Sequence, residues 1–94
     1  MSKFDWDDSN REKCTRRVPV HDIEALIDDW RTLIAGDPYE GETRFRAIGR
    51  SSEGLPLFVV FTMREKNGEL YVRPISTRYR HRGEGDEETV PEIR

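Results

Sequence analysis

The sequence predicts a single α+β domain in which two N-terminal helices pack on a roughly four-stranded antiparallel sheet. Apolar residues recur at helical spacing over residues 23–30, whereas residues 43–77 alternate in polarity or run continuously apolar, as strands do. Asn-Gly at positions 67–68 is a strong hairpin signal, because a type I′ turn requires positive φ at both central residues. A chain of 94 residues has room for one such core.

The N-terminal segment is expected to form a short strand and a polar helix. Residues 4–6 alternate apolar and polar side chains, as an opening strand does. The helix is expected over residues 8–17, with Asp8 or Ser9 as its N-cap, because either side chain can accept a backbone N–H. Pro19 then stops the helix.

A second helix is expected over about residues 21–30, capped by His21 or Asp22. Its core-facing stripe follows the i, i+3, i+4, i+7 spacing and consists of Ile23, Leu26, Ile27 and Trp30. Trp6 is expected to pack the opening strand onto the helices.

Strands are expected over residues 32–35, 43–50, 55–63 and 70–77. Residues 55–63 are apolar on both faces, which is typical of a central strand that is covered on both sides. Pro74 lacks a backbone donor, so the last strand should lie at an edge or carry a bulge. A short final helix is expected to begin within residues 78–82.

Charge is unevenly distributed in this chain, whose net charge is −3. Residues 43–82 hold nine basic and three acidic side chains, whereas residues 83–94 hold five acidic side chains and Arg94. We therefore expect one domain over residues 1–82 and an acidic, disordered tail over residues 83–94. The basic half indicates an anion-binding face, and the alternative is an ordinary solvated surface.

Several classes of protein are excluded by composition. The longest apolar run, residues 55–63, is far shorter than the ~20 residues that span a membrane, and the N-terminus lacks the apolar stretch of a signal peptide. Cys14 is the single cysteine, so we expect a cytoplasmic protein without an internal disulfide. His21 and His81 are the two histidines, which together with one cysteine are too few ligands for a structural zinc site. Neither a zinc site nor another cofactor is therefore expected.

Five segments, in order, resemble the BrnT family of type II toxins. They are Phe4–Asp7, residues 23–50, the Arg44–Gly49 strand within that block, Val59–Arg64 and Arg73–Tyr79. The resemblance implies a fold like that of RelE ribonucleases and cleavage of RNA. It also implies a ribbon-helix-helix antitoxin of the BrnA kind, through which the toxin contacts operator DNA.

The chain departs from this family between the two helices. Family members usually carry Lys-His-Gly-Val there, whereas this chain has Arg17-Val18-Pro19-Val20. Arg17 can hold a phosphate but cannot act as a general base, because a guanidinium does not lose its proton at working pH.

Cleavage of RNA without a metal requires a base for the ribose 2′-hydroxyl, stabilisation of the phosphorane and a proton for the leaving oxygen. The family match suggests Arg64 and Arg78 as catalytic residues, since a guanidinium fork fits two phosphoryl oxygens. An antiparallel hairpin centred on Asn-Gly would place these two arginines at opposite ends of the strand pair, unless a bulge at Pro74 or the reach of the side chains closes the gap. Each could equally be a strand-end arginine in solvent.

The segment from Arg73 to Arg82 is the densest basic cluster. His81 is a candidate general base, because its cationic neighbours favour the neutral imidazole, although it could simply be a surface histidine. The candidate RNA-binding residues are Arg17, Arg73, Tyr79, Arg80 and Arg82.

Three hypotheses remain open from the sequence. The first is an endoribonuclease toxin that is neutralised by an antitoxin. The second is a catalytically inactive relative that only binds an antitoxin-like repressor and so tunes transcription. The third is a protein-binding module without any nucleic-acid contact.

Overall fold

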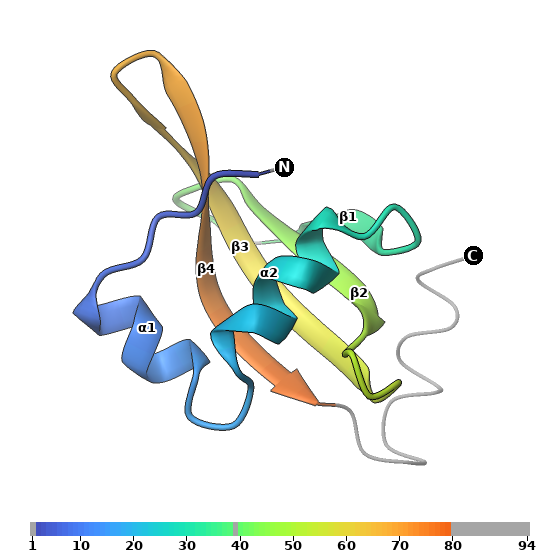
Figure 1. The fold of residues 1–94 in the computed structure, drawn as a ribbon. Coiled ribbons are helices and arrows are strands. Elements are labelled where there is room, and N and C mark those ends of the chain that lie inside the picture. Colours follow the sequence, from blue (N-terminus) through green and yellow to red (C-terminus); the bar gives the residue numbers. More distant parts are fainter. Residues whose placement is uncertain (1, 39, 80–94) are drawn as a thin grey trace.

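The computed structural model of this chain describes residues 2–38 and 40–79. Its elements are α1 (Asp8–Cys14), α2 (Val20–Asp28), β1 (Leu33–Asp37), β2 (Arg44–Arg50), β3 (Pro56–Lys66) and β4 (Glu69–Tyr79). The four strands form one antiparallel sheet in the order β1-β2-β3-β4, and both helices cover the same face of it (Figure 1). The predicted α+β class and its layers are confirmed.

The hydrophobic core lies between the helices and the sheet. Its buried side chains are Cys14, Val18, Ile23, Leu26, Ala47, Leu57, Val59, Phe61 and Val72. Helix α2 lies close against β2 at Gly49, where a Cβ atom would approach the Leu26 side chain to 3.1 Å and the Thr32 hydroxyl to 2.8 Å. Trp6 packs against this core, as the sequence predicts, and its Nε1 also donates to Glu24 of α2 at 2.9 Å.

The hairpin signals are confirmed by the backbone. Asn67 and Gly68 have φ of 53° and 81°, so both occupy the left-handed region that a type I′ turn needs. Pro74 lies in β4, at the edge of the sheet, where the pairing with β3 is irregular between Val60 and Phe61. Pro74 therefore lies both in an edge strand and at a bulge, the two positions predicted for a residue without a backbone donor.

The bounds of α1 differ from the prediction. Its N-cap is Asp7, not Asp8 or Ser9, because Asp7 forms a reciprocal capping box with the buried Asn10. The helix ends at Cys14 rather than Arg17, and the Thr15 hydroxyl donates to the Arg11 carbonyl at 2.6 Å.

The predicted end and caps of α2 were wrong. The helix begins after Pro19 without a side-chain cap, so neither His21 nor Asp22 serves as one. It ends at Asp28, because the Asp29 carboxylate accepts the backbone N–H of Arg31 at 2.9 Å and competes with a further helical turn. The predicted stripe therefore stops short of Trp30, which is 90% exposed.

The opening strand is reduced to one parallel bridge between Phe4 and Val72. At the other end of the domain, Arg78 and Tyr79 continue β4 rather than starting a helix. The rest of that predicted helix, and the predicted acidic tail over residues 83–94, lie outside the described residues. Over the described ranges, no helix is long and apolar enough to span a membrane.

Candidate functional site

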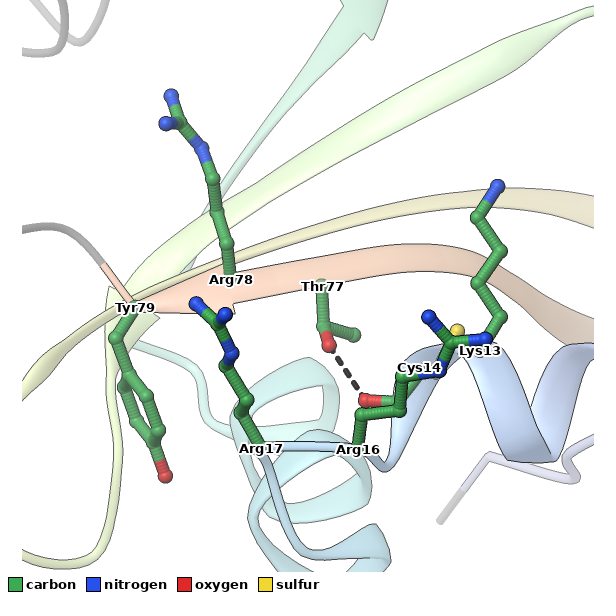
Figure 2. A pocket seen from close by; sticks show the side chains of 7 residues that line it. All are labelled: Lys13, Cys14, Arg16, Arg17, Thr77, Arg78 and Tyr79. Atoms are coloured by element: carbon green, nitrogen blue, oxygen red, sulfur yellow. Dashed lines mark hydrogen bonds between the residues drawn. The ribbon is translucent and has the colours of Figure 1, made fainter.

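A hollow of about 440 Å³ lies beside the end of β4, next to the connection from α1 to α2 (Figure 2). Its lining consists of Lys13, Cys14, Arg16, Arg17, Thr77, Arg78 and Tyr79. Four of these seven side chains are cationic, and none of the described lining residues is acidic. This charge pattern suits an anionic ligand, because clustered cations raise the local concentration of anions.

The connection between the helices is held in place by one hydrogen bond and one buried side chain. The Thr77 hydroxyl donates to the Cys14 carbonyl at 2.6 Å, which joins the end of α1 to β4 (Figure 2). Further along the connection, Val18 is only 1% exposed and anchors it in the core. Arg16 and Arg17 lie between these two anchors and are themselves exposed.

Arg78 and Tyr79 point to opposite sides of β4, as successive strand residues do (Figure 2). The Arg78 guanidinium lies 5.6 Å from the centre of the Phe58 ring, on the sheet face away from the helices. Tyr79 packs against the core on the helical side. Because β4 is an edge strand, Arg78 can still line the hollow from beside the strand.

The ionised groups of the described lining are its cations. Burial raises the pKa of the Cys14 thiol, which therefore remains protonated at neutral pH. Burial also raises the pKa of Tyr79, aided by the negative charges of Asp22 and Glu53 and by a hydrogen bond to Asp22. Arg16 lies 3.7 Å from Glu12, an exposed pair of the kind that contributes under about 1 kcal/mol.

Three predicted RNA-binding or catalytic residues are brought together in this hollow, namely Arg17, Arg78 and Tyr79. Arg80, His81 and Arg82 follow directly in the chain but lie outside the described residues. Sequence reasoning missed Lys13 and Arg16, although the basic run at the end of the first predicted helix was a signal for them.

Arg73 lies elsewhere, against the N-terminal segment. Its guanidinium contacts the Asp7 carboxylate at 2.8 Å and the Asp5 carboxylate at 3.3 Å. These contacts join β4 to the segment that precedes α1, so Arg73 has a structural role at this place in the fold.

Arg64 is also remote from the hollow. It is exposed on the hairpin arm, where it pairs with Tyr71, whereas Arg78 pairs with Phe58. Phe58 and Arg64 are six residues apart on β3, which corresponds to about 20 Å at ~3.3 Å per residue. The two arginines thus occupy opposite ends of the strand pair, as the hairpin signal predicted.

No group of three or more potential metal ligands occurs among the described His, Cys, Asp and Glu residues. The groups that the described lining of the hollow offers are four basic side chains, the Thr77 hydroxyl, the Cys14 thiol and the Tyr79 phenol.

A comparison with protein families identifies a family that covers most of the described domain. The family described as "Ribonuclease toxin, BrnT, of type II toxin-antitoxin system" matches residues 6–84, which is most of the chain. No curated protein matches the chain.

Proposed function

We propose that this chain, which belongs to the BrnT family of ribonuclease toxins of type II toxin–antitoxin systems, cleaves RNA at the basic hollow beside β4. The observation that carries the proposal is the gathering of Lys13, Arg16, Arg17 and Arg78 around one hollow without an acidic neighbour in its described lining. A phosphodiester is the ligand that such a group of cations fits best.

The proposed reaction needs no metal ion. The ribose 2′-hydroxyl loses its proton to a base, and the 2′-oxygen attacks the adjacent phosphorus. The bond from phosphorus to the 5′-oxygen breaks, and that oxygen gains a proton. The products are a 2′,3′-cyclic phosphate and a 5′-hydroxyl end.

In this scheme, Arg17 and Arg78 bind the phosphoryl oxygens and stabilise the extra negative charge of the phosphorane. The proposal is supported by the fact that both residues line the hollow, Arg17 from the connection between the helices and Arg78 from the end of β4. His81 is proposed as the base because it follows Tyr79 by two residues in the chain and histidine is the side chain that most often acts as a general base. Arg64 is left out of the reaction because it lies at the far end of the hairpin.

Membership of a type II toxin family implies a protein antitoxin as partner. We propose that this antitoxin is a ribbon-helix-helix protein of the BrnA kind, that it covers the basic surface near residues 73–82, and that operator DNA is contacted only through it. The affinity of the complex should then fall as salt rises, because the attraction between opposite charges is screened. A complex that is insensitive to salt would instead indicate apolar docking elsewhere.

A second function is favoured by one specific observation. The described lining holds no carboxylate or imidazole to act as a base near neutral pH, and Arg17 replaces the lysine that the family usually carries. If His81 does not supply the base, the chain binds RNA or antitoxin without cutting and tunes transcription through its partner. Both functions place the protein in the cytoplasm.

One experiment separates these functions. The chain is induced in a bacterial host alone and together with its antitoxin, and growth and RNA integrity are followed. The purified chain is then incubated with RNA in EDTA, and the new 3′ ends are tested for a cyclic phosphate. The ribonuclease proposal predicts toxicity that the antitoxin relieves, with cyclic ends in EDTA. Intact RNA and normal growth would establish the binding-only function instead.

A further inference from the structure

The two edges of the sheet differ in how well they are protected. At the β4 edge, Pro74 removes a backbone donor and the pairing with β3 shifts register. The N-terminal segment also lies along part of this edge. The Asp5 N–H donates to the Val72 carbonyl at 2.8 Å, and the Val72 N–H donates to the Lys3 carbonyl at 2.8 Å. Features of this kind hinder an edge strand from pairing with another chain.

The opposite edge, β1, lacks these features (Figure 1). Within the described part of the chain, β1 pairs only with β2, through five consecutive residues in continuous register. Its sequence, Leu-Ile-Ala-Gly-Asp, contains no proline, lysine or arginine. The backbone N–H and C=O groups on the side away from β2 therefore suit pairing with a further strand.

Apolar side chains are exposed along the β1 edge. Leu33 is 41% exposed and Ile34 is 50% exposed, and these successive residues lie on opposite faces of the sheet. Trp30, in the turn before the strand, is 90% exposed. That turn is fixed, because the Asp29 carboxylate accepts the backbone N–H of Arg31 at 2.9 Å and forms an ion pair with its guanidinium. A rigid, exposed tryptophan beside an apolar edge strand is typical of a surface that another protein chain covers.

The β1 edge is complementary to a second copy of itself. If two β1 strands pair antiparallel about a two-fold axis, all five residues pair only when the axis passes through Ala35. This register places Ile34 of each copy opposite Gly36 of the other, on the face that carries the helices. Gly36 leaves room for that side chain, because a Cβ atom at Gly36 would meet no other part of its own chain within 4 Å.

The charges at this edge do not oppose the pairing. In the same register, Asp37 of each copy lies opposite Leu33 of the other, so the two Asp37 carboxylates are at opposite ends of the strand pair. Asp37 also forms an ion pair with Arg46 of its own chain, at 3.4 Å. In the turn before the strand, Asp29 and Arg31 pair with each other. Two identical edges can therefore approach without bringing uncompensated like charges together.

We propose that two copies of this chain associate through their β1 edges, so that their two four-stranded sheets become one continuous antiparallel sheet. The contact is isologous and therefore closes at two copies. The hollow lies beside β4, at the other edge of each sheet, so pairing at β1 does not cover it. This inference does not depend on the proposed cleavage of RNA.

Sedimentation of the full chain over a range of concentrations tests the association. Because five paired residues make a small interface, the dissociation constant is expected to be on the order of 1–100 µM. Ile34→Lys should raise this constant about 10- to 100-fold, because it removes an apolar contact and places two cations diagonally across the axis. Leu70→Lys is the matched control, since Leu70 is 62% exposed on the hairpin arm and receives the same charge. It should leave the dissociation constant unchanged.

A cysteine at the two-fold axis tests the register. Residues directly opposite in an antiparallel pair have Cα atoms about 4.5–5.5 Å apart, which is within the range that a disulfide spans. With oxidised glutathione as the oxidant, Ala35→Cys should therefore give a disulfide-linked dimer on a non-reducing gel. The wild-type chain, whose Cys14 is buried, should give none, and neither should the control variant Leu70→Cys.

Urea unfolding shows that the compared variants are folded, which is expected because Ile34 and Leu70 are exposed. A wild-type chain that stays monomeric at the highest concentration would overturn the proposal. So would a wild-type dissociation constant in folded Ile34→Lys, or the absence of the Ala35→Cys dimer. If the β1 amides of a monomeric chain become protected from hydrogen exchange only when the antitoxin is added, the edge binds the antitoxin and the proposed self-association is wrong.

Discussion

Replacing Arg78 and Arg64 separately by alanine distinguishes the hollow from the hairpin arm as the site of phosphate binding. Both residues are exposed and both lie in paired strands, so the same substitution makes no core cavity in either case. Arg78 lines the basic hollow, whereas Arg64 lies about 20 Å away along β3.

The size of each effect follows from distance. Loss of a donor that contacts the phosphorane slows cleavage by about 100- to 1,000-fold in comparable sites, which is expected for Arg78→Ala. A unit charge 20 Å away in water contributes only ~0.2 kcal/mol before screening, and the Debye length at physiological salt is about 8 Å. Arg64→Ala should therefore change kcat/KM by less than about 1.5-fold.

The assay is the cleavage rate of a short RNA at physiological ionic strength, with urea unfolding as the measure of stability. Arg78→Ala should cost only about 0.5–1 kcal/mol of unfolding free energy, through its lost contact with the Phe58 ring. If folded Arg64→Ala loses as much activity as folded Arg78→Ala, the RNA is bound along the hairpin arm and the basic hollow is not the site.

Three further predictions concern stability. Asn10→Ala should lower the unfolding free energy by about 1–3 kcal/mol, because the buried amide donates to the Asp5 and Pro74 carbonyls and accepts the Asp7 N–H. Urea titration measures this change, and an unchanged unfolding free energy would contradict the prediction. Gly68→Ala should cost about 1–2 kcal/mol, since φ is 81° there, and an unchanged melting temperature would contradict the turn assignment. The pKa of Asp5 is lowered chiefly by the Lys66 hydrogen bond, and that of Asp7 by the Asn10 backbone N–H and then by Arg73. Depressed pKa values stabilise the fold above the unfolded value of 3.8, so this contribution should be lost as pH falls below about 3.8. The acid-induced loss should be smaller in Lys66→Met, and an equal loss would contradict this cause.

The features that sequence predicted well depend on neighbouring residues. Helical spacing placed the stripe of α2, and Asn67-Gly68 placed the hairpin, because backbone conformation there is decided within a few residues. The end of α2 was not predicted, because the interaction that ends the helix is local but has only a weak signal in the sequence. The Asp29 carboxylate accepts the backbone N–H of Arg31, which competes with a further helical turn. The apolar pattern of the sequence does not indicate this hydrogen bond.

The hollow could be predicted only in part, because its two halves are separated by about sixty residues. Lys13 to Arg17 and Thr77 to Tyr79 meet through the packing of α1 on β4 and the hydrogen bond from Thr77 to the Cys14 carbonyl. A sequence gives the number of cations in each segment but not the distances between them. The assignment of Asp22 as a helix cap failed for the same reason, since its carboxylate accepts the Ser52 hydroxyl from the turn between β2 and β3.

Hairpin geometry allows one long-range conclusion from sequence alone. When the turn is fixed at Asn67-Gly68, residues equally distant from it pair, so a residue near the turn and one far from it must lie apart. Arg64 is three residues before Asn67 and Arg78 is ten residues after Gly68, so the sequence predicts that they lie at opposite ends of the strand pair, as their pairing with Tyr71 and Phe58 shows. Counting residues from the turn therefore shows that the two candidate residues lie at different positions along the strand pair. To bring Arg78 and Arg17 together requires the packing of a helix connection beside the strand, which only the folded chain provides.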